Sequence, residues 1–355
     1  MKIGVVKERK DGENRVGMTP DGVKTLLDAG HRVIVERNAG TGSGFEDREY
    51  AEAGAVLADD ARDVYAESEL LIKVKEPLPE EYPFLRQGQI LFAYLHPAAM
   101  PRLRQALQAS QCIAFAYEMV RDRDGSLPLL VPMSEIAGRM SIQIAARLLE
   151  KSAGGPGIML GGVPGVAPAE VVIVGGGIVG ENAARMAVGA GARVTVLEVN
   201  PARLRQLERI FNGRARTLMS SRQNILAGLK QADVLIGAVL VPGKQAPKVV
   251  TKEMIAAMKP GSVVIDVAVD QGGCIETIDR TTSHTEPTYV VDGVVHYAVP
   301  NIPGMVPRTA TLALTNATLP YILELAGKGW EQVIAEKSAL AEAVCYVRGS
   351  QVANF

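Results

Sequence analysis

The sequence predicts an α/β protein of two domains, each built on a largely parallel sheet. Three observations carry this prediction. The chain has 355 residues, which is more than one domain of ordinary size uses. Short apolar segments of strand length alternate with helical segments through most of the chain. One segment, residues 171–198, has a complete strand–turn–helix–strand pattern, which places two strands in parallel.

The first part of the chain alternates strands and helices up to about residue 151. Strands are expected at residues 2–6, 31–36, 70–74, 89–95 and 112–117, with helices near 20–28 and 47–53. A longer helix is expected to start at Ser134, which resembles a cap, because Ile136, Met140, Ile144 and Leu148 recur at helical spacing. We expect this helix to carry the chain into the second domain.

Residues 171–198 have the features of a dinucleotide-binding unit. An apolar strand leads into the turn Gly-Gly-Gly-Ile-Val-Gly at residues 175–180, and a helix and a second strand follow. Such glycines allow a tight turn, the approach of a pyrophosphate to the helix N-terminus, and close packing of helix on strand. A plain βαβ turn is the alternative.

The second strand of this unit ends at Glu198. A carboxylate there accepts hydrogen bonds from the adenosine ribose and repels a 2′-phosphate, so the sequence predicts NAD rather than NADP. Arg203 and Arg205 follow closely and could partly offset this repulsion.

The remaining elements complete a Rossmann-like sheet, and two helical stretches are left over. The nucleotide domain is expected to contain helices at 201–211 and 252–258, strands at 234–239 and 263–267, and a strand-rich piece at 289–299. Two further helical stretches, 310–326 and 330–347, are more than that domain needs. We therefore expect a discontinuous substrate domain at residues 1–128 and 307–355, an NAD-binding domain at 129–306, and a ligand cleft between them.

The composition excludes several classes of protein. The net charge of −1 gives no general attraction to nucleic acid or to an anionic membrane. The three cysteines lack metal-type spacing and predict reduced thiols, a cytoplasmic location and no zinc. The N-terminus has no signal-peptide pattern. The uncharged stretch 152–169 is rich in glycine and proline, which fits an interdomain connection and not a membrane helix.

Four ionisable residues lie where an α/β enzyme keeps its chemistry, at or just after the ends of strands. His96, Asp270 and Lys75 follow apolar strands directly, and Arg15 follows a turn after the first strand. Each also has a structural explanation: a satisfied histidine, a turn former, an edge-strand guard and a solvated loop charge, respectively. Lys73 lies two residues before Lys75 and shares its face of the strand.

Several longer strings resemble the L-alanine dehydrogenase family, and the resemblance runs over nearly the whole chain. The strings are Glu8 with Glu13-Asn14-Arg15-Val16 and Thr19-Pro20, Lys73-Val74-Lys75-Glu76-Pro77, Leu95-His96, Pro132-Met133-Ser134-Glu135-Ile136-Ala137-Gly138-Arg139, residues 161–166, residues 236–243, Asp270-Gln271-Gly272-Gly273-Cys274 and residues 314–318. The resemblance implies reversible, NAD-dependent oxidative deamination of L-alanine to pyruvate and ammonium by a homohexamer.

The resemblance also implies roles for individual residues. Arg15 and Lys75 would bind the substrate carboxylate, and His96 and Asp270 would serve catalysis. The implied cofactor contacts are Ser134, Gly175, Gly177, Ile178, Val179, Gly180, Glu198, Arg203, Ser220, Val239, Leu240, Val267, Ala268, Val269, Asp270, Ala298, Val299, Pro300 and Asn301.

The chain departs from the family pattern at four points. Glu198 replaces the usual aspartate, Pro300 replaces a small residue and stiffens its loop, and the chain stops short of the usual C-terminus. Some relatives hold a metal between a glutamate like Glu118 and a late histidine, but the late position is Lys328 here, so we expect no metal.

Three other functions stay open on the sequence. One is the NAD-binding component of a proton-translocating transhydrogenase, which has a similar fold and glycine turn. Another is a saccharopine-type dehydrogenase, a remoter relative. The third belongs to a different class: a non-catalytic NAD-binding regulator, which would keep the glycine turn and Glu198 but not need the four ionisable residues.

Overall fold

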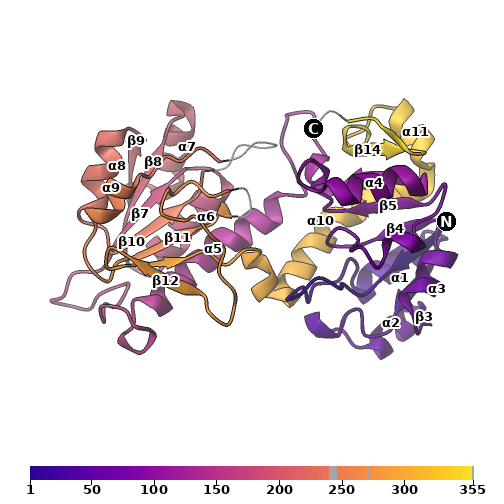
Figure 1. Ribbon diagram of the computed structural model, residues 1–355, viewed down its shortest axis with the longest axis horizontal. Coiled ribbons are helices and arrows are strands. Elements are labelled where there is room, and N and C mark those ends of the chain that lie inside the picture. The colour runs from indigo at the N-terminus through magenta and orange to yellow at the C-terminus, as the bar shows by residue number, and fades with distance from the viewer. Residues whose placement is uncertain (240–245, 270–271, 354–355) are drawn as a thin grey trace. The chain divides into compact units, whose positions relative to one another are not determined.

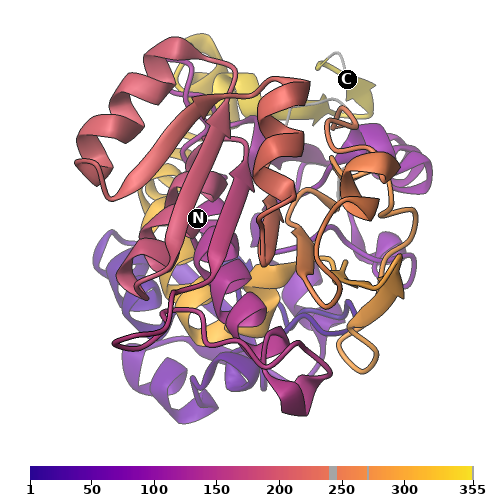
Figure 2. The same ribbon diagram turned by 90° about the vertical axis from the view of Figure 1, so that its left-hand side faces the viewer.

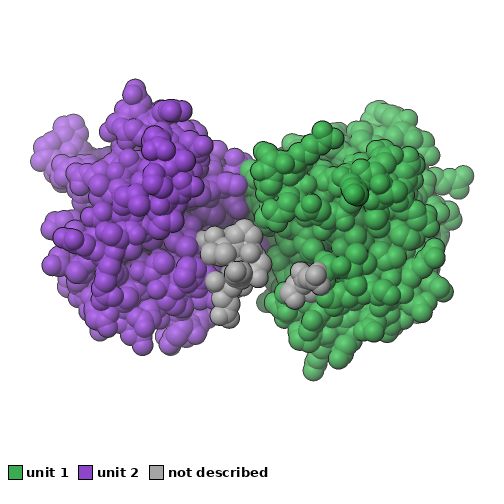
Figure 3. Space-filling model, turned by 90° about the horizontal axis from the view of Figure 1, so that it is seen from above, with its two compact units in different colours: residues 1–133, 304–355 green, residues 134–303 purple. Residues whose placement is uncertain are grey.

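The structure, a computed structural model, describes residues 1–239, 246–269 and 272–353. It forms two compact units (Figure 3): unit 1 comprises Met1–Met133 and Gly304–Phe355, and unit 2 comprises Ser134–Pro303. Each unit contains one mostly parallel sheet, which confirms the predicted fold class. The predicted site residues Leu240 and Asp270 lie outside the described residues.

Unit 1 contains an eight-stranded sheet in the order β15-β14-β6-β5-β4-β1-β2-β3. From β1 the chain adds β2 and β3 on one side, then returns to add β4, β5 and β6 on the other. The strand order therefore reverses between β1 and β4, which pair in parallel. The strands are β1 Lys2–Val5, β2 Arg32–Glu36, β3 Val56–Ala58, β4 Leu70–Ile72, β5 Ile90–Ala93, β6 Ile113–Ala116, β14 Val344–Val347 and β15 Ser350–Gln351.

The helices of unit 1 come from both ends of the chain, as the indigo and yellow ribbons of Figure 1 show. The C-terminal helix α10 is bonded to N-terminal loops, because Thr311 Oγ1 accepts a hydrogen bond from the Val16 amide at 3.1 Å and lies 2.8 Å from Ser43 Oγ. The helices are α1 Pro20–Asp28, α2 Asp47–Ala53, α3 Ala61–Glu67, α4 Pro101–Ser110, α10 Pro307–Lys328 and α11 Trp330–Ala335; α5 Val131–Leu148 begins in unit 1 and continues into unit 2.

Unit 2 contains a seven-stranded sheet in the order β12-β13-β11-β10-β7-β8-β9, which reverses between β7 and β10 (Figure 2). Alternate residues of its strands enter two different cores: Ile173 and Ile265 pack on one face, and Val172 and Val264 on the other. Both faces are therefore covered, as parallel sheets require. The elements are β7 Glu170–Val174, α6 Ile178–Gly189, β8 Arg193–Glu198, α7 Pro201–Phe211, β9 Ala215–Met219, α8 Arg222–Leu229, β10 Val234–Gly237, α9 Lys252–Ala256, β11 Val263–Asp266, β12 Thr288–Val291 and β13 Val294–Tyr297.

Two sequence-based expectations about helices were wrong. Helix α5 begins at Val131, so Ser134 lies inside its first turn and is no cap. The predicted helix at 330–347 ends at Ala335, and its last part is strand β14, antiparallel to β6. Lys337 has a left-handed φ of 51°, which a helix cannot continue through, and the Val-Cys-Tyr-Val run of β14 favours a buried strand.

The glycine-rich stretch 152–169 lies inside unit 2, so it is not the connection that the sequence indicated. The first passage between the units falls within α5, between Met133 and Ser134, as the helix prediction expected. Among the described residues, no helix is both long and apolar enough to cross a membrane.

Candidate active site

In unit 1, three of the predicted residues follow neighbouring strands. Arg15 follows β1, Lys75 follows β4 and His96 follows β5, and these strands pair in parallel. Parallel neighbours end at the same edge of a sheet, so the three residues belong to one edge. It includes the point where the strand order reverses, which is where open α/β sheets bind their ligands.

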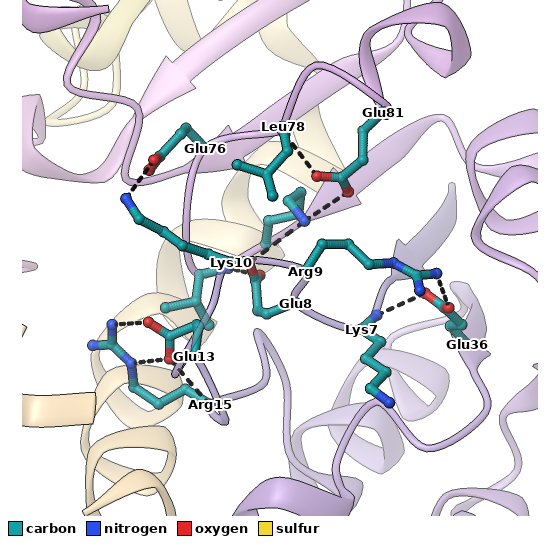
Figure 4. Close-up of polar contacts among 12 residues, drawn as sticks. Lys7, Glu8, Arg9, Lys10, Glu13, Arg15, Glu36, Glu76, Leu78 and Glu81 are labelled. Atoms are coloured by element: carbon teal, nitrogen blue, oxygen red, sulfur yellow. Dashed lines mark hydrogen bonds and ion pairs between the residues drawn. The ribbon is translucent and has the colours of Figure 1, made fainter. Parts of the chain in front are cut away.

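Arg15 is buried and forms a fork with Glu13, as Figure 4 shows. Its Nε donates to Glu13 Oε1 at 2.6 Å and its Nη2 to Oε2 at 2.5 Å, while Nη1 lies 3.0 Å from Met133 Sδ. Burial alone would raise the pKa of Glu13, but the hydrogen bonds and charge of Arg15, together with the charge of Lys75, hold it below its ordinary value. Glu13 is therefore a standing counter-ion for both cations, a role that sequence reasoning missed.

Lys73 is fully buried between two carboxylates, so it is not equivalent to Lys75 although both lie on the same face of the strand. Its Nζ lies 2.9 Å from Glu81 Oε1 and 3.5 Å from Glu8 Oε2. The other oxygen of Glu8 accepts a hydrogen bond from the amide of Val74 at 2.6 Å. This buried triad fixes the main chain immediately before Lys75.

We expect Glu8 to make the protein less stable as the pH rises from 5 to 8. Burial is the main cause that raises the pKa of Glu8 to about 7, against the opposing charge of Lys73. The folded state therefore holds a proton that the unfolded state has released above its ordinary pKa of 4.5, and the corresponding stability is lost as the pH rises through about 7.

Urea unfolding of wild type and Glu8→Gln at both pH values measures this effect. Relative to the variant, wild type should lose up to about 3 kcal/mol on going from pH 5 to pH 8, at about 1.4 kcal/mol for each unit between the two pKa values. Glu80→Gln, an exposed change in the next loop, should show no such dependence. A difference that is constant with pH, or that grows in favour of wild type, would contradict the prediction.

His96 has a strained main chain that Glu118 holds in place. Its φ is 44°, which is uncommon for a residue with a side chain. Glu118 accepts hydrogen bonds from the amides of His96 at 2.6 Å and Leu95 at 3.3 Å, and the His96 ring stacks on Tyr94 with an interplanar angle of 4°. The His96 side chain is 41% exposed, so its ring is accessible while Glu118 fixes its backbone.

Glu118 thus contacts both the backbone and the ring of His96, with Oε1 3.6 Å from Nδ1. Lys328, at the late position in the chain, forms a surface ion pair. Lys328 lies 3.2 Å from Glu324 and 2.6 Å from Glu336. Within the described ranges, no cluster of three or more metal-ligating side chains occurs.

In unit 2, the glycine turn follows β7 at the reversal of the strand order. Gly175 has a φ of 106°, and a Cβ there would lie 2.4 Å from the carbonyl oxygen of Ala238. A Cβ on Gly180 would lie 1.8 Å from the carbonyl oxygen of Gly175, so helix and strand pack too closely for any side chain. A Cβ on Gly177 would meet nothing within 4 Å, which leaves space at the N-terminus of α6. This geometry fits a bound pyrophosphate.

Glu198 lies beside this turn. Its Oε2 accepts a hydrogen bond from the Gly176 amide at 2.7 Å, and its Oε1 from the amides of Val199 and Asn200 at 2.8 and 2.9 Å. The amide of Ser220, just after β9, donates to the Glu198 carbonyl oxygen at 3.0 Å. The structure therefore brings Glu198, Ser220 and the glycine turn together.

The other predicted cofactor residues of unit 2 follow strands of the same sheet. Val239 follows β10, residues 267–269 follow β11, and residues 298–301 follow β13, all parallel neighbours. The buried Asp266 accepts the amides of Ala268 at 2.9 Å and Cys274 at 2.6 Å, which shapes the chain after β11. Ser134 lies on α5, where a Cβ on Gly138 would be 2.2 Å from the carbonyl oxygen of Val179, so α5 packs against the start of α6.

Two exposed apolar residues that sequence reasoning missed lie next to Glu198: Val199 follows it in the chain, and Met219 is paired with it across β8 and β9. Val199 is 67% exposed and Met219 46%, while Ile178, which the sequence analysis did name, is 38% exposed at the start of α6. Exposed apolar side chains at such a position suit a flat aromatic group. In the sequence, only the position of Val199 and Met219 at the ends of strands could have indicated that these residues belong to the site.

Comparisons with known proteins agree with this geometry. The family descriptions "Alanine dehydrogenase/PNT, N-terminal domain" and "Alanine dehydrogenase/PNT, C-terminal domain" match residues 4–137 and 141–354. The chain is 56% identical to alanine dehydrogenase of Methanococcus maripaludis, covering 98% of this chain and 94% of that protein. It is also 56% identical to alanine dehydrogenase of Bacillus subtilis, covering 96% and 89%.

Solved structures lead to the same group. A structure of L-alanine dehydrogenase matches with a TM-score of 0.96 and 51% identity, covering 99% of this chain and 97% of that one. A transhydrogenase from Sinorhizobium meliloti matches with a TM-score of 0.84 but 26% identity, covering 99% of each chain. The resemblance drawn from the sequence is confirmed, and the chain belongs to the alanine dehydrogenase/PNT family.

Proposed function

We propose that this protein is an L-alanine dehydrogenase, which converts L-alanine and NAD reversibly to pyruvate, ammonium and NADH. The observation that carries the proposal is the placement of two sets of residues at two reversals of strand order. Arg15 and Lys75 flank the reversal in unit 1, and the glycine turn with Glu198 flanks the reversal in unit 2. The family and the fold imply a nicotinamide cofactor, and when bound it supplies the hydride acceptor.

Arg15 and Lys75 would hold the substrate carboxylate. Glu13 bonds to Nε and Nη2 of Arg15, and Nη1 lies 3.0 Å from Met133 Sδ. A substrate carboxylate would therefore bind as a further acceptor at the two outer nitrogens. A guanidinium binds a carboxylate well along either edge. Glu13 already offsets part of the positive charge of Arg15 and Lys75. The attraction for a carboxylate comes from directed donors in a buried setting.

His96 would move the protons of the reaction. Oxidation of the amino acid gives an iminium, and hydrolysis to pyruvate and ammonium needs a group that accepts a proton from the attacking water and returns it to the leaving nitrogen. An imidazole does both near neutral pH. The fixed main chain and the stacked ring hold His96 in one orientation, which is the positioning that such a transfer requires. Asp270 lies outside the described residues, and its part in this step stays a prediction.

NAD is our proposal for the cofactor. Glu198 places a carboxylate on the Gly176 amide, where a ribose is expected and a 2′-phosphate would be repelled. Of the two basic residues that could offset this, Arg203 forms an ion pair with Glu181 at 2.6 Å, and Arg205 is exposed on α7. Ser134, Ser220, Val239, the residues after β11 and those after β13 complete the proposed cofactor contacts. The predicted interdomain cleft and the roles of the two domains stay predictions.

Two properties of the whole protein are proposed with the function. Three cysteines, Cys112, Cys274 and Cys345, are buried free thiols, which supports a reducing, cytoplasmic setting. We also propose a homohexamer, on the family resemblance; light scattering of the purified protein measures it.

One assay tests the function against its alternatives. Purified protein with NAD should form NADH with L-alanine, and far more slowly with L-serine or L-valine. Lysine with 2-oxoglutarate and NADH tests the saccharopine-type reaction. Protein that binds NADH but oxidises no amino acid would favour the transhydrogenase component or the regulator and overturn the proposal.

A further inference from the structure

Glu181, in the first turn of α6, lies between two arginines. Its Oε2 is 2.6 Å from Arg203 Nη2, and its Oε1 is 2.7 Å from Arg185 Nη2 and 2.9 Å from Arg185 Nε. Partial burial alone would raise the pKa of Glu181, but hydrogen bonds and charge from the two arginines lower it below its ordinary value. Glu181 is therefore an ionised carboxylate beside the glycine turn.

All three nitrogens of Arg203 are bonded to protein oxygens, and two of them, Nε and Nη2, hold it against that turn. Its Nε donates to the carbonyl oxygen of Gly176 at 2.7 Å, its Nη1 to Gln206 Oε1 at 3.1 Å, and its Nη2 to Glu181. The amide of Gly176 donates to Glu198, so a single glycine is contacted by Arg203 on one side and by Glu198 on the other. The guanidinium is thus adjacent to the expected ribose but directed at protein oxygens.

Two carboxylates and one compensated arginine therefore lie around the expected position of the adenosine ribose. An arginine near this position accommodates a 2′-phosphate, whereas an acid excludes it. Glu181 holds Nη2 of Arg203 while also pairing with Arg185. Removing Glu198 alone would therefore leave Arg203 bonded to protein oxygens and not free to bind a phosphate.

We propose that Glu181 is a second specificity-determining residue, which restrains Arg203 and so excludes NADP together with Glu198. The proposal rests on the proposed function, in which a dinucleotide binds at this turn. It follows that the two acids act as a unit. Replacing either one alone would admit NADPH poorly, and replacing both would release Arg203 toward a phosphate that no longer faces a carboxylate.

A double-mutant cycle on NADPH binding tests the proposal. Dissociation constants of NADH and NADPH are measured by calorimetry for wild type, Glu198→Gln, Glu181→Gln and the double variant. Glutamine keeps a hydrogen-bond acceptor for the Gly176 amide and removes only the charge. We expect each single change to tighten NADPH by less than ~5-fold, and the double change by at least ~5-fold more than the product of the two, as for coupled neighbours. NADH affinity of Glu181→Gln should stay within ~3-fold of wild type. Because Glu198 itself is expected to contact the ribose, the coupling is calculated from the ratio of NADPH to NADH affinity in each variant.

Two controls assign the gain to Arg203. Adding Arg203→Gln to the double variant should abolish it. Glu170→Gln removes a carboxylate that pairs with Arg193 at the opposite end of β7, and should leave NADPH affinity unchanged. Purely additive gains, or a gain that survives Arg203→Gln, would overturn the proposal. Wild type that binds neither dinucleotide would instead overturn the proposed function, so the two failures are distinguishable.

Discussion

Replacing His96 by alanine is expected to lower turnover with L-alanine by at least ~100-fold, the usual scale for losing a group that transfers protons. His96 is in unit 1, and its main chain is held by Glu118 and not by its own ring, so the substitution should leave the fold and NADH binding intact. Steady-state rates in both directions, with NADH affinity from fluorescence titration, measure the two effects separately.

His284 provides the matched control, because it is an exposed histidine in unit 2. His284→Ala should keep full activity. If His96→Ala retained more than a tenth of the wild-type turnover, His96 would not transfer the protons and another group would have to be found. A loss of NADH binding in the same variant would mean that the change is structural.

The glycine turn was predictable because its parts are local. Strand, turn, helix and terminal acid all lie within residues 170–198, and each glycine has a steric reason that a sequence pattern expresses. The placement of Arg15, Lys75 and His96 was predictable in the same way, since a residue after a parallel strand must lie at the carboxyl edge of the sheet.

The charge balance around Lys73 and Arg15 was not predictable, because sequence does not show which acid pairs with which cation. Lys73 and Lys75 look equivalent by spacing, yet Lys73 is enclosed by Glu8, which comes from the loop after β1, and by Glu81. Only the pairing of β1 with β4 brings Glu8 close to Lys73. Glu13 was close in sequence to Arg15, but a turn with several polar residues gives no sign of which one bonds to which.

The C-terminal strand β14 was missed for a related reason. The chain from Trp330 onward has apolar residues at a spacing that a helix also satisfies, and the deciding contact is the edge of β6. A short apolar run does not by itself separate a buried strand from a helix. Tertiary pairing decided the local structure here.

Replacing Lys75 by glutamine is expected to weaken pyruvate binding to the NADH complex by ~10- to 100-fold, the range for removing a hydrogen bond to a charged group. Lys75 lies in unit 1, whereas the proposed NAD contacts lie in unit 2, so NADH affinity should not change. Pyruvate should also bind wild type far better than an uncharged ketone of the same size, and this preference should fall in the variant.

The control for this variant must be another lysine of unit 1, and Lys73 does not serve. Glutamine at Lys73 would leave Glu8 and Glu81 buried without their cation, a change that commonly costs about 3–5 kcal/mol of stability. Lys7 lies in the loop after β1, is exposed, and contributes its backbone amide to Glu36, which Lys7→Gln preserves. Lys7→Gln should therefore bind pyruvate like wild type. Equal losses in the Lys7 and Lys75 variants would mean that general positive charge attracts the substrate, and that its carboxylate is bound by other residues.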